Sequence, residues 1–278
     1  MVVYEDALMT DTEALAQSIR GQCLRMVHRA NASHIGSCLS MIDLLAVLYG
    51  RILNVDPQQP DKPDRDRFLL SKGHAAAAVY ACLAECGFFP RSWLDDYCVD
   101  GSPLSGHLTH HGVPGVEIST GSLGHALPIA CGMALAAKRL KQPQRVFVIL
   151  SDGECDEGTT WEAALFAAHH RLDNLTVVVD YNRIQSFGRV SDVMELEPFA
   201  DKWQAFNWGV QAIDGHDHAR IESCLRDVPF MAGRPSLIVA HTIKGKGVPF
   251  TEDRLEWHYR SPNDGQLAEA LSLVGYCS

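Results

Sequence analysis

The sequence has little positive charge and nothing that resembles a targeting segment. It contains 24 lysine and arginine residues against 34 aspartate and glutamate residues, which gives a formal net charge of -10. Acidic residues spread along the chain disfavour binding to nucleic acid or to an anionic membrane surface. The first residues, MVVYEDALMTDTE, lack the basic flank and the apolar stretch of a secretory signal, so we predict a cytoplasmic protein.

Long apolar runs are also scarce. Residues 118–137 form the only uncharged stretch of membrane-spanning length. This stretch contains Gly121, Gly124, Pro128 and Gly132, which are unfavourable in a helix that faces lipid. We therefore expect no membrane association and predict a buried helix behind a glycine-rich turn.

Cysteine patterns typical of disulfide frameworks or zinc sites are absent. The nine cysteines are an odd number, and no two of them form a Cys-x-x-Cys pair. A chain of 278 residues can bury a core without disulfide bonds, so we expect reduced thiols. A metal shared by Cys82 and Cys86 on one predicted helix is an alternative, but buried free cysteines are common and no metal is predicted there.

The hydrophobic pattern of the chain indicates an α/β fold. Apolar runs rich in valine and isoleucine alternate with amphipathic segments from residue 145 onward. This alternation is typical of βαβ units, which give a parallel sheet with helices on both faces. We expect one domain, residues 1–278. Strands are predicted at 145–151, 175–181, 209–214 and 236–243, and helices at 160–170, 198–206 and 218–225.

Three further helices are predicted in the first half of the chain. The first begins at a capping box formed by Thr10 and Glu13 and continues to about residue 30. The other two cover residues 40–48 and 74–86, and a glycine follows each of them closely. The segments between these helices are predicted to be irregular.

Polar residues follow two of the predicted strands directly. Asp152 comes after the strand at 145–151, and Asn182 comes after the strand at 175–181. Ligands of open parallel sheets bind beyond the carboxyl ends of the strands. Carboxylate and amide oxygens at two neighbouring strand ends suit Mg²⁺ that holds a diphosphate, and Gly153 would let the backbone approach it. The alternative is that Asp152 and Asn182 are ordinary turn or capping residues.

The spacing of these residues leads to a family resemblance. Asp152 and Gly153 are followed 30 residues later by Asn182, as in the thiamin diphosphate motif Gly-Asp-Gly…Asn, although Ser151 replaces the first glycine. With the other segments, residues 33–258 resemble the N-terminal, diphosphate-binding part of transketolases. The segments are SHIGS, LSKGHA, SGHL, TGSLGH, SDGECDEGTTWEA, LDNLTVVVDYNRIQ, IDGHD, HTIKGKGVPF and EWH.

The resemblance implies a role for each matching residue. Asp152, Asn182 and the main-chain carbonyl of Ile184 would ligate Mg²⁺. Gly121 and Gly153 would approach thiamin diphosphate. Further implied contacts are Leu123 near the cofactor rings, His74 at the diphosphate with Lys244 and His258 nearby, and His34 and His107 along the substrate channel.

Three histidines are catalytic candidates, and one glutamate is expected at a subunit interface. Neutral imidazoles can hydrogen-bond sugar hydroxyls and transfer protons near pH 7, so His34, His107 and His258 are catalytic candidates. The resemblance implies that Glu157 lies at a subunit interface, where it couples paired active sites. The remaining histidines are treated as structural, at 28, 169, 170, 216 and 218, or are left undecided, at 110 and 111.

The resemblance also implies a partner. Transketolases take a catalytic glutamate from a pyrimidine-binding domain, and no second α/β pattern follows His258. We therefore expect a split enzyme, with a separate C-terminal subunit and two copies of each subunit. The expected reaction transfers a two-carbon ketol unit from a ketose phosphate to an aldose phosphate.

Two other functions stay open. Tyr259 stands where the family usually has glycine, which favours a specialised transketolase-like enzyme with a non-standard acceptor. The other alternative is a non-catalytic regulatory subunit. The intact set of Asp152, Asn182 and histidines argues against the regulatory subunit.

Overall fold

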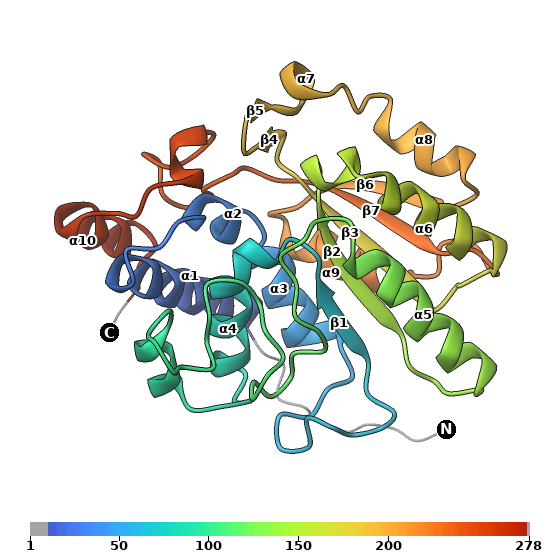
Figure 1. Cartoon of the computed structure of the whole chain (residues 1–278), viewed down its shortest axis with the longest axis horizontal. Coiled ribbons are helices and arrows are strands. Elements are labelled where there is room, and N and C mark those ends of the chain that lie inside the picture. The colour runs from blue at the N-terminus through green and yellow to red at the C-terminus, as the bar shows by residue number, and fades with distance from the viewer. Residues whose placement is uncertain (1–10, 277–278) are drawn as a thin grey trace.

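A five-stranded parallel sheet forms the centre of the computed structural model, which describes residues 11–276 (Figure 1). The strand order is β1-β2-β3-β7-β6, and every pair is parallel. The predicted α/β class is therefore confirmed. The strands are β1 (Arg67–Leu70), β2 (Val146–Ser151), β3 (Leu175–Tyr181), β6 (Gly209–Asp214) and β7 (Ser236–His241).

Both faces of the sheet are covered because side chains alternate along each strand. In β2, Phe147 and Ile149 point into one apolar cluster, and Val146 and Val148 point into another. The first cluster packs α1 (Thr12–Arg29), α2 (Ile35–Ser40), α3 (Ile42–Val47), α4 (Ala76–Glu85) and α9 (His218–Arg226), and the second packs α5 (Ala126–Arg139), α6 (Gly158–His169) and α8 (Phe199–Ala205).

Smaller elements complete the described part of the chain. A two-stranded antiparallel hairpin is formed by β4 (Ile184–Gln185) and β5 (Gly188–Arg189), directly after the end of β3. The others are α7 (Val190–Val193), α10 (Asp264–Leu273), the π-helical turn η1 (Leu48–Ile52) and the 3-10 turns η2 (Gly73–Ala75), η3 (Arg91–Asp96), η4 (Gly153–Asp156) and η5 (Leu255–His258).

Some predicted boundaries are wrong in detail. The cap of α1 is Asp11, whose side chain accepts hydrogen bonds from the amides of Glu13 and Ala14, while Thr10 lies outside the described residues. The predicted helix at 40–48 is divided at Met41 between α2 and α3. Strand β1 was not predicted, because only four residues form it.

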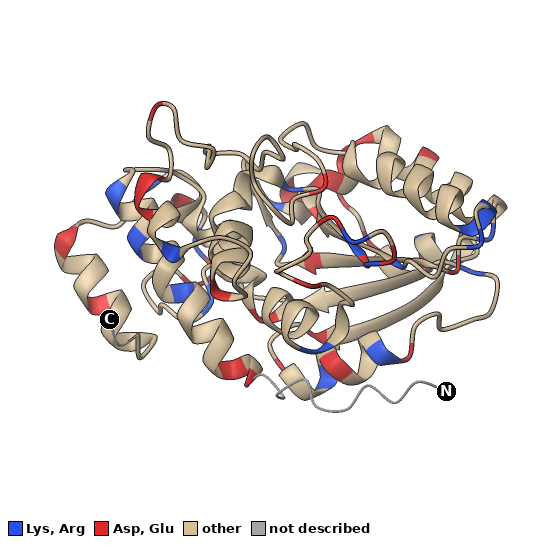
Figure 2. Ribbon diagram, turned by 90° about the horizontal axis from the view of Figure 1, so that it is seen from below, with Lys and Arg blue, Asp and Glu red and all other residues tan. Residues whose placement is uncertain are grey.

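The buried helix predicted within 118–137 is present, but only one side of it is buried. Helix α5 begins at Ala126 behind the glycine-rich turn, but one side faces solvent, where Ile129 is 42% exposed. Within residues 11–276, none of the helices is both long enough and apolar enough to cross a membrane. Acidic and basic residues are interspersed over the outer helices and loops (Figure 2).

The topology brings two of the predicted site segments together. Strands β2 and β3 are neighbours, and Ser151 pairs with Asp180 at their carboxyl ends. Strand β7 lies on the other side of β3 and pairs His241 with Tyr181. The loops after β2, β3 and β7 therefore leave the sheet at one edge, where the site residues are expected.

Candidate active site

A cavity of about 110 Å³ lies at this edge of the sheet. It brings together eight of the predicted site residues from loops that are distant in sequence. These eight are His74, Leu123, Asp152, Gly153, Asn182, Ile184, Lys244 and His258. Ser37, Lys72, Ser151, Gln185 and Ser186 complete the lining.

The Asp152 carboxylate links the end of β2 to the loop that follows β3. One of its oxygens accepts a hydrogen bond from the amide of Gly153 at 2.7 Å, and the other accepts one from the amide of Arg183. The residue is 1% exposed. Burial, together with the nearby charge of Asp180, raises the pKa of Asp152 to about 6. A buried carboxylate with a raised pKa in a cleft is typical of functional sites.

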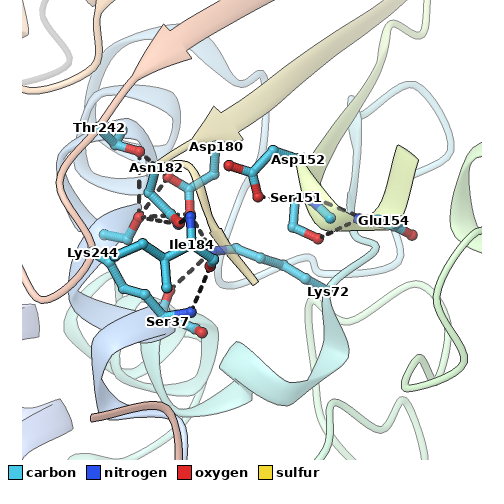
Figure 3. A network of polar contacts seen from close by, with 12 residues as sticks. Ser37, Lys72, Ser151, Asp152, Glu154, Asp180, Asn182, Ile184, Thr242 and Lys244 are labelled. Atoms are coloured by element: carbon cyan, nitrogen blue, oxygen red, sulfur yellow. Dashed lines mark hydrogen bonds and ion pairs between the residues drawn. The ribbon is translucent and has the colours of Figure 1, made fainter. Parts of the chain in front are cut away.

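The orientation of the Asn182 side chain is fixed by three hydrogen bonds (Figure 3). Its Nδ2 donates to Ser40 Oγ at 3.0 Å and to Asp180 Oδ2 at 3.2 Å. Its Oδ1 accepts from the amide of Ile184 at 3.1 Å. The amide oxygen is therefore held on the side of the Ile184 backbone.

The donor atoms fit a magnesium ion. A carboxylate of Asp152, the amide oxygen of Asn182 and the carbonyl of Ile184 are hard oxygen ligands, and Mg²⁺ takes a few of these together with phosphate oxygens. The Ile184 carbonyl accepts a hydrogen bond from Lys244 Nζ at 2.7 Å, and a carbonyl oxygen has a second lone pair for another partner.

Asp180 and Lys72 form a buried ion pair beside these residues, which sequence reasoning missed (Figure 3). Ser40 and Thr242 also donate hydrogen bonds to the Asp180 carboxylate. Burial alone would raise the pKa of Asp180, but the ion pair and these hydrogen bonds hold it below its ordinary value. Lys72 Nζ also donates to the carbonyl of Ser37 at 2.9 Å, so the pair connects α2 to β3.

Glu154 is a second buried carboxylate that sequence reasoning passed over. It accepts hydrogen bonds from the hydroxyl of Ser71 and from the amides of Gly124, at 2.7 Å, and Ser151, at 3.3 Å. Burial raises its pKa. Glu154 therefore fastens the loops after β1 and β2 to the glycine-rich turn before α5.

Four histidines meet beside the cavity. The ring centroid of His34 lies 5.1 Å from that of His74, 5.9 Å from that of His107 and 4.9 Å from that of His258. His34 adopts a left-handed backbone conformation with φ of 75°, and its amide donates to the carbonyl of His258 at 2.9 Å. Segments separated by more than 200 residues in sequence are thus joined at this point.

Three of these imidazoles, those of His34, His74 and His258, are held in their neutral form. Burial, followed by the proximity of His107 and Lys244, lowers the pKa of His34 to about 4. Burial and the adjacent Lys244 lower the pKa of His258 to about 3. His74 has a pKa well below its ordinary value for the same reasons, burial first. Burial and the charge of Lys72 lower the pKa of Lys244 itself to about 8.

Comparison with known proteins identifies the family. Residues 11–276 match the family described as the transketolase, thiamine diphosphate binding domain. The chain belongs to the transketolase family. The resemblance predicted from the motifs is therefore confirmed.

Relatives of nearly equal length are named as transketolase subunits. The chain is 40% identical over 262 residues to an apulose-4-phosphate transketolase subunit of Actinobacillus succinogenes, covering 94% of this chain and 95% of the relative. It is 42% identical over 248 residues to 6-deoxy-6-sulfo-D-fructose transketolase subunit SqwG of a Clostridium species, covering 89% and 90%. The chain thus carries the thiamine diphosphate-binding domain of the transketolase-type transferases.

Solved transketolases share the fold but are much longer. Transketolase from Leishmania mexicana superposes with a TM-score of 0.91 at 28% identity, covering 96% of this chain and 42% of the solved one. Transketolase from Campylobacter jejuni superposes with a TM-score of 0.89 at 29% identity, covering 95% and 43%. The present chain corresponds to less than half of these enzymes.

The structure places the other predicted residues of this transketolase chain outside the cavity lining. Gly121 lies against His107, since a Cβ added to Gly121 would come within 3.1 Å of that ring. Glu157 is exposed at the start of α6. Gly153, within the lining, packs against the hairpin, because an added Cβ would lie 2.7 Å from that of Gln185.

Several other histidines have local partners. His28 contacts Asp264 at 2.8 Å, and both His216 and His218 contact Asp43, at 2.7 and 2.9 Å. These contacts fit the structural role predicted for the three histidines. His110, left undecided from the sequence, contacts Ser119 Oγ at 2.8 Å and stacks beside His111.

The raised pKa of Asp152 predicts a pH dependence of stability in metal-free buffer. The carboxyl titrates near 3.8 when unfolded and near 6 when folded. Between these two pH values the folded state keeps the proton that the unfolded state has lost. The protonated Asp152 therefore contributes to the free energy of unfolding at low pH, and this contribution is lost as pH rises through 6. Between pH 4 and pH 7, urea denaturation should show the wild type losing about 2 to 3 kcal/mol relative to Asp152→Asn. Parallel pH profiles of the two proteins would contradict this assignment.

Proposed function

We propose that the chain is the diphosphate-binding subunit of a two-subunit transketolase that uses thiamin diphosphate and Mg²⁺. The reaction is transfer of a two-carbon ketol unit from a ketose phosphate to an aldose phosphate. The observation that carries the proposal is that Asp152, Asn182 and Ile184 line one cavity, beside the clustered imidazoles of His34, His74 and His258. Thiamin diphosphate, when bound, supplies the nucleophilic carbon and the electron sink.

In this proposal, some residues of the chain hold Mg²⁺ and the cofactor, and others transfer a proton. Asp152, Asn182 and the Ile184 carbonyl would hold Mg²⁺, and His74 and Lys244 would contact the diphosphate. Gly121, Gly153 and Leu123 would lie against the cofactor. The imidazoles of His34, His107 and His258 would hydrogen-bond the sugar hydroxyls and move the proton at the donor hydroxyl oxygen.

A partner subunit with the pyrimidine-binding domain belongs to the proposal, in an assembly of two copies of each chain. The subunit names of the full-length relatives support a partner. An apolar surface between α5 and α6 supports it too, because Ile129 and Phe166 line one hollow there and are 42% and 41% exposed. Large exposed apolar patches mark interaction sites. Glu157 stands at the start of α6 beside this surface, where it would couple the paired sites.

Two further parts of the proposal concern organisation and location. Residues 1–278 would form one diphosphate-binding domain. The eight cysteines in the described residues are free, which supports a reducing compartment such as the cytoplasm.

A specialised transketolase-like enzyme that acts on a non-standard sugar is the second candidate function. It is favoured by the names of two relatives, which refer to apulose 4-phosphate and to 6-deoxy-6-sulfo-D-fructose. A fructose derivative is a ketose, so assays of the assembled enzyme should include sulfonated ketoses as donors, beside ordinary sugar phosphates as donors and acceptors. A non-catalytic subunit would bind thiamin diphosphate weakly or not at all in calorimetry with the partner present.

Removing the charged metal ligand tests the cofactor site. Replacing Asp152 by Ala leaves Mg²⁺ without its carboxylate, so we expect the assembled enzyme to lose thiamin diphosphate retention and activity. Calorimetry in Mg²⁺ buffer measures the loss, and Asp201→Ala, an exposed aspartate on α8, is the matched control. Unchanged cofactor affinity in Asp152→Ala would refute the assigned site.

Dependence on the partner can be measured directly. The isolated chain should show no ketol transfer, and activity should appear when the partner subunit is added. Size-exclusion chromatography with light scattering should then show two copies of each chain. Appreciable turnover by the isolated chain would exclude obligate assembly.

The histidine roles are tested by His107→Ala and His258→Ala. A positioned acid or base is worth roughly 10² to 10⁴ in rate, so turnover should fall by a factor in this range. Circular dichroism and Mg²⁺-dependent cofactor binding should be retained, because neither residue is a proposed metal ligand. His28→Ala, which removes a surface contact with Asp264, is the control. A double variant with near wild-type kcat/KM would move proton transfer elsewhere.

A further inference from the structure

Tyr259 joins two segments at the solvent side of the cavity. It follows His258 at the end of η5, and its ring lies edge-on to the His258 ring with the centroids 4.9 Å apart. The side chain is 55% exposed, yet its hydroxyl donates a hydrogen bond to the carbonyl of Ser186 at 2.7 Å. The Tyr259 carbonyl accepts from Ser33 Oγ at 3.2 Å, which fixes the start of the bridge.

The segment that receives this hydrogen bond forms one wall of the cavity. Ile184, Gln185 and Ser186 are consecutive lining residues in the hairpin of β4 and β5. The first is held by Lys244, and Gln185 Nε2 donates to Asp156 Oδ2 at 3.1 Å. Tyr259 holds the third and outermost of them, so the tip of the hairpin depends on this contact.

We propose that Tyr259 is a specificity-determining residue that limits the length of the aldose accepted by the enzyme. This inference rests on the proposed function. Tyr259 does not itself line the cavity, but its hydroxyl holds Ser186 and its ring lies against His258, and both of these residues do line it. A longer sugar that extended beyond the His258 imidazole toward Ser186 would therefore meet the tyrosine ring and the hairpin that it holds.

Two variants separate the bridge from the ring. Tyr259→Phe removes only the hydroxyl, whereas Tyr259→Gly removes the whole side chain. The measured quantity is the ratio of kcat/KM for a five-carbon aldose phosphate to that for a three-carbon one, with the partner subunit and one ketose phosphate donor. We expect the ratio to rise about two- to fivefold in Tyr259→Phe, the size of one net hydrogen bond. It should rise about tenfold or more in Tyr259→Gly.

Hydrogen exchange gives a second readout that needs no activity. Amides of residues 186–189 should exchange faster in Tyr259→Phe than in the wild type, because the hairpin tip has lost an anchor. Tyr276→Phe is the matched control, since the Tyr276 ring packs against Gly21 and stacks on Arg25. It should leave both the ratio and the exchange rates unchanged.

Three results would overturn the inference. They are an unchanged ratio in both variants, an equal loss of activity with both acceptors, and unchanged exchange at residues 186–189. If the assembled wild type transferred no ketol unit to any acceptor, the proposed function would fail, and with it the role in specificity. The exchange measurement would still decide whether Tyr259 holds the hairpin.

Discussion

The buried carboxylate of Asp180 connects the segments that form the candidate active site. It accepts hydrogen bonds from Ser40, Thr242 and Asn182 and forms an ion pair with Lys72, so α2, the loop after β1, β3 and β7 all meet at one residue. Removing one partner of a buried pair costs about 3 to 5 kcal/mol, because the other charge is left without compensation. The same carboxylate fixes the amide of Asn182 and adds to the effect of burial, which raises the pKa of Asp152.

The repulsion between buried carboxylates is strongest at the position where Mg²⁺ is proposed. Two carboxylates, Asp152 and Asp180, lie close together and are buried, and only Asp180 has a lysine in direct contact. The Asp152 carboxylate therefore carries the unfavourable part of the arrangement. The proposed Mg²⁺ would offset this repulsion, because a divalent ion beside Asp152 stabilises the charged carboxylate.

Much of the fold and part of the site could be predicted from the sequence. Strand ends carry their residues to one edge of a parallel sheet, so the proximity of Asp152 and Asn182 followed from the pattern alone. The pairing of Lys72 with Asp180 could not be predicted, because it depends on which strands become neighbours. Glu154 was passed over for a similar reason, since its partners lie in two loops and at the end of β2.

The left-handed conformation of His34 has a consequence for the entropy of ligand binding. A side chain other than glycine at φ of 75° is unfavourable by roughly 1 kcal/mol or more, and here the hydrogen bond to the His258 carbonyl helps to maintain it. The backbone at the histidine cluster is therefore ordered before any ligand arrives. The conformational entropy of this backbone is lost during folding and not during binding. Less of the favourable contact energy is therefore needed to offset entropy loss when a ligand binds.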